Sequence, residues 1–211
     1  MNRTYISEIR MLKKYKYLDK PTLIAGFPGP GLVGSISTSF IIDYLNMHQI
    51  ACLESDYITP GVIYIGGKLR HPFRIYSNKD RNICVMVCEA PILINGIHVV
   101  MDTLMRWSKE NNVKEVIVLD SIPLNGVLKE GRQTIILHDE GLHREVIDKD
   151  QHYNKNKISK VEKNSKLDRN AIENSTNYNY TAYIGGLAGG LLSSCLSYGI
   201  SCTAILVPAP T

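Results

Sequence analysis

Apolar residues in this chain follow two spacings, and these divide it into predicted strands and helices. Short apolar runs bounded by glycine, proline or polar residues predict strands at 23–27, 50–54, 82–89, 113–119 and 201–207. Longer segments with apolar residues every three or four positions predict helices at 32–45, 96–111 and 184–198. Strands that alternate with helices are typical of an α/β domain with parallel strands.

The first two predicted helices carry the clearest apolar stripes. In the first, a stripe with a spacing of four contains Leu32, Ile36, Phe40 and Tyr44. In the second, the predicted inner stripe contains Ile97, Val100, Met101, Leu104, and Trp107 or Ser108. Asp102 and Arg106 lie on another face of that helix, where we expect an ion pair worth a few tenths of a kcal/mol.

The segment 61–76 interrupts this alternation. Two short strands, 61–65 and 70–76, flank the turn 66–69 and predict a hairpin. A doubly wound dinucleotide-binding fold would instead continue with a second crossover helix. Further short strands are predicted at 134–137 and 145–147. We therefore predict a single α/β domain over 1–211, with three layers: a mixed sheet and helices on both faces.

A long polar segment, 149–180, is rich in Lys, Asn and Ser and predicts a variable loop, with one helical turn near 168–173. Seven basic and three acidic residues between Lys149 and Arg169 carry a net charge of +4, which equals that of the whole chain. Only Tyr153 supplies an aromatic ring there, so a solvated surface segment is favoured over a nucleic-acid site. A basic RNA-binding loop is the competing hypothesis.

Composition indicates a cytoplasmic protein without a membrane segment. No apolar run approaches the ~18–20 residues that a membrane helix needs, and the polar first 20 residues do not form a secretory signal. An odd number of cysteines lies in apolar runs, which indicates reduced thiols: Cys52, Cys84, Cys88, Cys195 and Cys202. No Cys-x-x-Cys pair is present, so we predict no structural metal site.

The turn after the first predicted strand allows two interpretations. Gly29, Gly31 and Gly34 match the G-x-G-x-x-G dinucleotide fingerprint, and Glu54 follows at about the expected 20 residues. However, Pro28 and Pro30 lack the N–H groups that a phosphate would need. A rigid strand-to-helix turn is therefore favoured. The alternative is a nucleotide- or nucleoside-binding enzyme, with these candidate ligand residues: Gly29, Gly31, Gly34, Ser35 and Glu54.

A second glycine cluster lies at the start of the third predicted helix. Its members are spaced so that one helix face permits close approach of another backbone: Gly185, Gly186, Gly189 and Gly190. Each glycine weakens an isolated helix by ~0.8–1 kcal/mol relative to alanine, so packing on the sheet or on a partner subunit has to compensate. An anion-binding helix start is the alternative interpretation.

Other residues suggest chemistry less strongly. The segment 138–143 resembles a metal cluster, but His138 and His143 are five apart and share no helix face, so a surface turn is favoured. Glu89, Asp120 and Ser121 end predicted strands, where acid–base chemistry is conceivable and solvent-facing side chains are the simpler interpretation. A Gly-x-Ser-x-Gly nucleophile motif is absent. We predict no catalytic residue and no cofactor.

Two segments resemble the proteasome assembly chaperone family in its archaeal branch. Residues 26–35, Gly-Phe-Pro-Gly-Pro-Gly-Leu-Val-Gly-Ser, resemble the opening signature of that family, and 184–192 resemble its second glycine-rich helix. The residues that carry the resemblance are Gly26, Phe27, Pro28, Gly29, Gly31, Gly34, Gly185, Gly186, Gly189 and Gly190.

The resemblance implies a nucleoside-phosphorylase-like fold, homo-oligomerisation and binding to proteasome subunits. The family has also been described as related to ATP-grasp enzymes, without an established reaction. Family members usually carry a further C-terminal helix, and archaeal ones dock through a hydrophobic–Tyr–any tail. This chain ends Val-Pro-Ala-Pro-Thr, so we expect either that the sequence is truncated before that helix or that this member engages its partners differently. The predicted function is that of a non-catalytic proteasome assembly chaperone.

Overall fold

The structure, a computed structural model, describes residues 6–12, 18–123, 134–139 and 183–209. Its strands are β1 (Ser7–Met11), β2 (Thr22–Gly26), β3 (His48–Ser55), β4 (Ile63–Ile65), β5 (Lys68–Arg70), β6 (Phe73–Ser77), β7 (Ile83–Cys88), β8 (Glu115–Pro123), β9 (Ile135–His138) and β10 (Ser201–Ala209). Its helices are α1 (Val33–Tyr44), α2 (Ile97–Glu110) and α5 (Gly186–Tyr198), with 3-10 turns η1 (Pro30–Leu32) and η2 (Ile94–Gly96).

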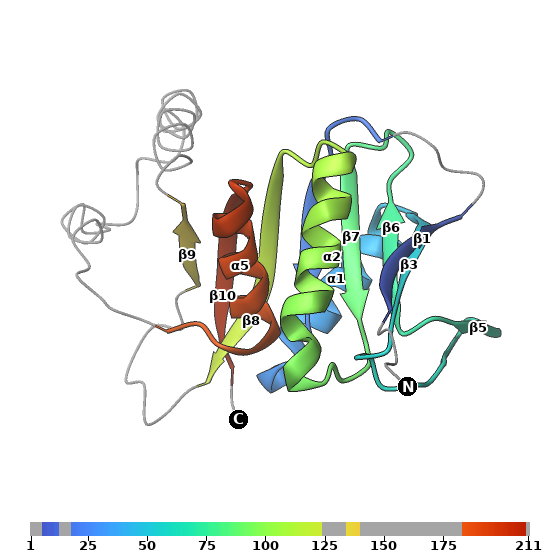
Figure 1. The fold of residues 1–211 in the computed structure, drawn as a ribbon, viewed down its shortest axis with the longest axis horizontal. Coiled ribbons are helices and arrows are strands. Elements are labelled where there is room, and N and C mark those ends of the chain that lie inside the picture. The colour runs from blue at the N-terminus through green and yellow to red at the C-terminus, as the bar shows by residue number, and fades with distance from the viewer. Residues whose placement is uncertain (1–5, 13–17, 124–133, 140–182, 210–211) are drawn as a thin grey trace, which may run out of the picture. The chain divides into compact units, whose positions relative to one another are not determined.

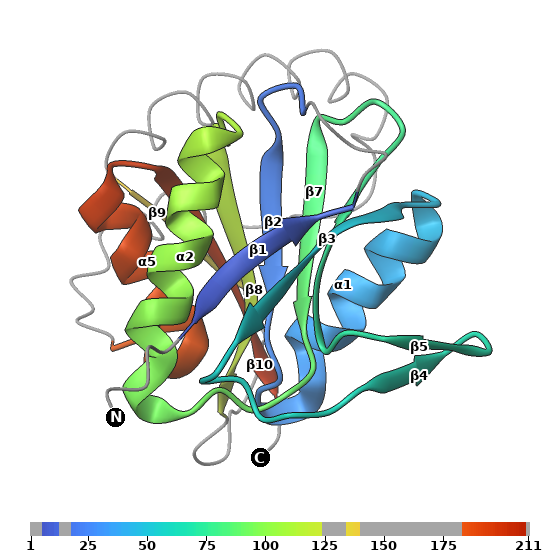
Figure 2. The same ribbon diagram turned by 45° about the vertical axis from the view of Figure 1, so that its right-hand side comes forward.

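One mixed sheet forms the centre of the unit that comprises Met1–Asp139 and Gly185–Thr211. Its strand order is β1-β3-β6-β7-β2-β8-β10-β9, in which β7, β2, β8 and β10 are parallel neighbours and the other pairs are antiparallel. Helices α2 and α5 pack together on one face of the sheet, and α1 lies on the other (Figures 1 and 2). The predicted three-layer α/β fold with a mixed sheet is confirmed.

Most predicted elements are confirmed, with two differences. Strand β1 was not predicted, because a short amphipathic segment with Glu8 and Arg10 on one face gives no continuous apolar run. The predicted hairpin is also wrong in its second strand. That strand divides into β5, which pairs with β4 across Gly66 and Gly67, and β6, which joins the main sheet. Both turn glycines have positive φ, as the type I′ turn of a two-residue hairpin requires.

Helix α1 faces the sheet with its small residues. Gly34 and Thr38 are its buried positions, while Ile41 and Ile42 pack partly against Val85 and neighbouring side chains of the sheet. The stripe that predicts the helix points away from the sheet. Leu32, Ile36, Phe40 and Tyr44 are 54%, 62%, 65% and 74% exposed. Periodicity identifies the helix, but it does not say which apolar side meets the core.

Helix α2 has the predicted orientation. Val100, Met101 and Leu104 are fully buried, and Trp107 and Ser108 lie beside them. The predicted ion pair between Asp102 and Arg106 has an N–O distance of 3.1 Å. Tyr198 of α5 also donates a hydrogen bond to Asp102, so this surface pair joins the two helices.

Some predictions fall outside the described residues. These are the strand at 145–147, the polar loop at 149–180 and the helical turn near 168–173. Among the described helices, none has the length and apolar character needed to cross a membrane. The predicted single domain over 1–211 and the nucleoside-phosphorylase-like arrangement stay predictions.

Candidate functional site

The glycine-rich turn after β2 is packed tightly against the sheet. A Cβ on Gly34 would lie 2.6 Å from the carbonyl oxygen of Leu119 and 2.8 Å from the backbone N and O of Phe27. A Cβ on Gly26 would lie 2.3 Å from the carbonyl oxygen of Gly34. These two glycines therefore allow the end of β2, the start of α1 and strand β8 to touch through their backbones.

The tightest bend of the turn precedes α1. Gly31 and Leu32 both have left-handed backbone angles, with φ of 65° and 52°, and the N–H of Leu32 donates to the carbonyl of Gly29 at 3.0 Å. A Cβ on Gly31 would lie 2.7 Å from the Cβ of Ala209 at the end of β10. The turn thus rests on β10 and directs Leu32 outward.

A carboxylate occupies the space beside Gly29 in the turn. The position of a Cβ on Gly29 is 2.9 Å from Oδ1 of Asp120, which accepts a hydrogen bond from the N–H of Ser121 at 2.8 Å. Burial raises the pKa of Asp120, and the Ser121 hydrogen bond opposes that shift. A negative carboxylate repels a phosphate, so this geometry favours the packing interpretation of the turn.

Glu54 does not adjoin the glycine turn. Two strands, β6 and β7, lie between β3 and β2, so Glu54 is about 14 Å away at the usual strand spacing. Its carboxylate instead forms an ion pair with Arg10 at 3.1 Å and faces His71 at 3.9 Å. Ser35 lies half-buried in the first turn of α1. The candidate ligand residues therefore divide into two separate places.

The strand-end carboxylates are also separated. Glu89 follows β7 and forms an ion pair with the buried Arg74, whereas Asp120 lies in β8, on the far side of β2. Because strand β2 separates them, Glu89 and Asp120 do not form the paired carboxylates that acid–base catalysis would use.

The second glycine cluster lies where α5 meets α2. A Cβ on Gly190 would be 3.1 Å from Cγ2 of Ile97, the first residue of α2. Gly186 has a φ of 64°, and the N–H of Gly189 donates to the carbonyl of Gly185 at 3.1 Å. Within the cluster, Gly190 serves the contact between the two helices, whereas a Cβ on Gly186 would meet nothing within 4 Å.

The candidate metal segment at 138–143 is described only at its start. Nδ1 of His138 lies 2.9 Å from the hydroxyl of Thr203, and Asp139 accepts a hydrogen bond from the N–H of Cys202 at 3.2 Å. Both partners belong to β10, so these two side chains fasten β9 to its neighbour. Residues 140–143 lie outside the described part of the chain.

The structure exposes two apolar surfaces that the sequence analysis did not identify as exposed. The first, which we call the α1 stripe, consists of Leu32, Ile36, Phe40 and Tyr44, with the rings of Phe40 and Tyr44 stacked at 5.8 Å. The second is the β4–β5 hairpin, which exposes Val62, Tyr64, Ile65 and Leu69. The spacing of the α1 stripe was visible in the sequence, but its outward direction was not.

The described residues thus form an α/β scaffold with a packed glycine turn and exposed apolar surfaces. The sequence profile of the PAC2 family matches residues 23–211, and the chain belongs to this family. It is 35% identical over 94 residues to the uncharacterized protein MJ0106 of Methanocaldococcus jannaschii; this match covers 44% of the chain and 40% of that relative. The chain thus matches less than half the length of MJ0106.

Solved structures show the same fold. A protein of unknown function from Thermoplasma acidophilum is 29% identical, with a TM-score of 0.69, and the match covers 92% of this chain and 69% of that one. Pyrococcus furiosus PbaA, an archaeal homolog of proteasome-assembly chaperone, is 19% identical with a TM-score of 0.71, over 97% of this chain and 76% of its own. These similarities support the predicted family.

Proposed function

We propose that this chain is a non-catalytic chaperone-like protein of the cytoplasm that binds proteasome subunits and acts as a homo-oligomer. The observation that carries the proposal is the exposed α1 stripe in a member of the PAC2 family. The likeness to PbaA supports the kind of partner, since PbaA is itself an archaeal homolog of proteasome-assembly chaperone.

The α1 stripe has the chemistry of a protein-binding surface. Helix α1 contains one charged residue, Asp43, near its end, whereas a helix that faces only water usually carries charges along its outer face. Aromatic side chains dominate the binding energy of many interfaces, and the stacked rings of Phe40 and Tyr44 form a ready anchor. An unassembled subunit with an apolar face of its own would bury this stripe.

A double substitution on the stripe tests the proposal. We expect Phe40→Ser with Tyr44→Ser to weaken binding to archaeal proteasome subunits by at least about tenfold, because each aromatic anchor can contribute ~2 kcal/mol. The free energy of unfolding should change little, since both side chains are exposed. Co-purification with tagged protein and a binding titration measure the effect.

The matched control is Leu196→Ser on α5, where the leucine is 65% exposed but lies outside the stripe. This control should bind as the unmodified chain does. Recovery of no proteasome subunit by the unmodified chain would refute the proposal. Equal binding by the double variant would show that another surface is used.

The β4–β5 hairpin supports the homo-oligomer. It forms a two-stranded sheet of its own, projects from the main sheet, and pairs Tyr64 directly opposite Leu69 (Figure 2). A two-stranded hairpin alone is only marginally stable in water, so we infer that a second copy of the chain covers it. Light scattering should give a mass above the 23.6 kDa of one chain, and Leu69→Lys should lower it. A monomeric unmodified chain would contradict this part.

A further inference from the structure

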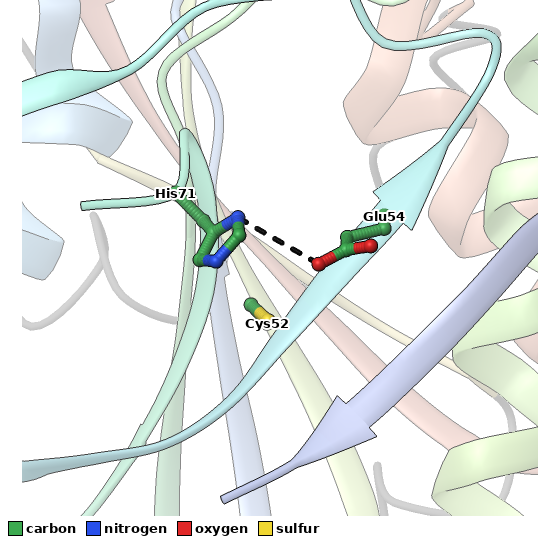
Figure 3. A group of neighbouring side chains, drawn as sticks. All are labelled: Cys52, Glu54 and His71. Carbon is green, nitrogen blue, oxygen red and sulfur yellow. Dashed lines mark ion pairs between the residues drawn. The ribbon is translucent and has the colours of Figure 1, made fainter.

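Three side chains of metal-binding types converge at the end of β3. Cys52 and Glu54 are two residues apart on this strand and therefore point to the same face, and His71 lies in the connection between β5 and β6. The thiol sulfur, a carboxylate oxygen and an imidazole nitrogen all lie within 4.8 Å of one another. Figure 3 shows the imidazole and carboxylate facing each other, with the Cys52 side chain close by.

Strand pairing brings these residues together. Strands β3 and β6 are antiparallel, with Cys52 opposite Arg74, so the chain that leads into β6 passes beside the end of β3. Arg74 donates a hydrogen bond to the carbonyl of His71 and thereby fixes the backbone that carries the imidazole. The arrangement therefore depends on the register of the sheet and not on a surface loop alone.

We propose that Cys52, Glu54 and His71 form a binding site for Zn²⁺, with a fourth position open to solvent. Thiolate, imidazole and carboxylate are the three ligand types that zinc takes in proteins, whereas Mg²⁺ and Ca²⁺ prefer oxygen alone. Zinc–ligand bonds of about 2.0–2.3 Å place tetrahedral ligand atoms about 3.3–3.7 Å apart. Side-chain rotation can close the present distances, because the His71 and Glu54 side chains are 54% and 33% exposed.

The neighbouring Arg10 leaves the required carboxylate oxygen available. Its guanidinium pairs with Oε2 of Glu54 at 3.1 Å, while Oε1 is the oxygen that faces His71. Arg10 also pairs with Glu8 at 2.7 Å, so its charge is shared between two carboxylates. In the proposed site Arg10 holds Glu54 in position through Oε2 without binding the metal itself. The negative charges of thiolate and carboxylate together balance the charge of Zn²⁺.

The thiol must lose its proton to bind the metal. Burial raises the pKa of Cys52, the Glu54 carboxylate raises it further, and Arg10 opposes both. Zinc therefore displaces this proton into solvent as the sulfur–metal bond forms. His71 also has to be neutral. Affinity should thus increase with pH, because the metal has to displace a proton from the thiol.

A cobalt titration of the reduced, purified full chain tests the site. Co²⁺ should bind at one equivalent and produce a thiolate-to-cobalt charge-transfer band together with the intense visible bands of tetrahedral cobalt, and Zn²⁺ should remove both. Cys52→Ser should abolish the charge-transfer band. His71→Asn changes an exposed side chain, so we expect the fold to be unchanged. This variant should weaken binding by at least about tenfold.

The matched controls are His48→Asn, an exposed histidine on the same strand, and Cys84→Ala, a buried cysteine in β7. Both should keep the cobalt spectrum. Zinc at 100 times its Kd should raise the Tm of the unmodified chain by about 5–10 °C and that of His71→Asn by much less. Absence of the charge-transfer band at saturating cobalt would overturn the proposal, as would a band that persists in Cys52→Ser.

Discussion

Glu89→Ala is expected to lower the free energy of unfolding by about 3–5 kcal/mol, because it leaves a buried guanidinium without its counter-charge. The partner is Arg74, which is only 2% exposed. Besides Glu89, its guanidinium donates to the carbonyl of His71 and, at 2.9 Å, to the hydroxyl of Tyr76. Those neutral acceptors remain in the variant, but they do not neutralise the charge. Urea unfolding followed by circular dichroism measures the change.

An exposed ion pair provides the comparison. Glu8→Ala removes a carboxylate that pairs with Arg10 at 2.7 Å, where the two side chains are 47% and 60% exposed. Its loss should cost no more than about 1 kcal/mol. Adding Arg74→Met to Glu89→Ala should restore part of the lost stability, since it removes the unpaired charge. Equal costs for Glu89→Ala and Glu8→Ala would show that the Arg74 pair is not effectively buried.

The Arg74–Glu89 pair also links the end of β7 to the proposed zinc site. Arg74 binds the carbonyl of His71, so loss of its partner should loosen the segment that carries the imidazole. None of these contacts could be predicted from sequence. Each depends on the antiparallel register that places Arg74 opposite Cys52 on one side and Val87 on the other.

The elements that sequence predicts best are interior strands of the sheet. Strands β7 and β8 are nearly continuous apolar runs bounded by polar residues, and that pattern alone locates them. Strand β1 was missed because its side chains are largely exposed and its one apolar face is short. For α1, apolar residues lie on two sides, and the choice between them is made by Gly34 and Thr38, which fit against the sheet.

At the glycine turn and at the proposed zinc site, the sequence predicts only the residues that are close together along the chain. The glycines of the turn are a sequence pattern, but the atoms that fill the space beside them come from β8 and β10, about 90 and 180 residues further along the chain. In the same way, Cys52 and Glu54 form a recognisable alternation, and His71 joins them only through strand pairing. A motif based on close sequence spacing, such as Cys-x-x-Cys, cannot reveal such a set.

Gly34→Ala is the second substitution with a large expected effect, a loss of about 2–3 kcal/mol in the free energy of unfolding. The new Cβ would lie within 2.8 Å of three backbone atoms: the carbonyl oxygen of Leu119 and the N and O of Phe27. Backbone atoms of a central sheet cannot move aside as a flexible side chain can. The loss should exceed the ~1 kcal/mol that alanine gains over glycine as a helix former.

Gly190→Ala is the matched control, because Gly190 is also a helical glycine that faces a packed neighbour. Its new Cβ would lie 3.1 Å from Cγ2 of Ile97, so this methyl group would have to move by only a few tenths of an ångström. The helix-forming gain of about 1 kcal/mol should then offset the crowding, so stability should stay within about 1 kcal/mol of the unmodified chain.

Comparing Gly34→Ala with Gly190→Ala distinguishes a packing role of the first glycine-rich turn from a ligand-binding role. A packing role predicts that Gly34→Ala loses stability with or without nucleotide present, because the clash lies between the helix and the sheet. A ligand-cradle role predicts a stable variant that loses a nucleotide-dependent rise in Tm. If Gly34→Ala were as stable as Gly190→Ala, the packing interpretation would fail, and a small-molecule site at the turn would become the better explanation of Gly29, Gly31 and Gly34.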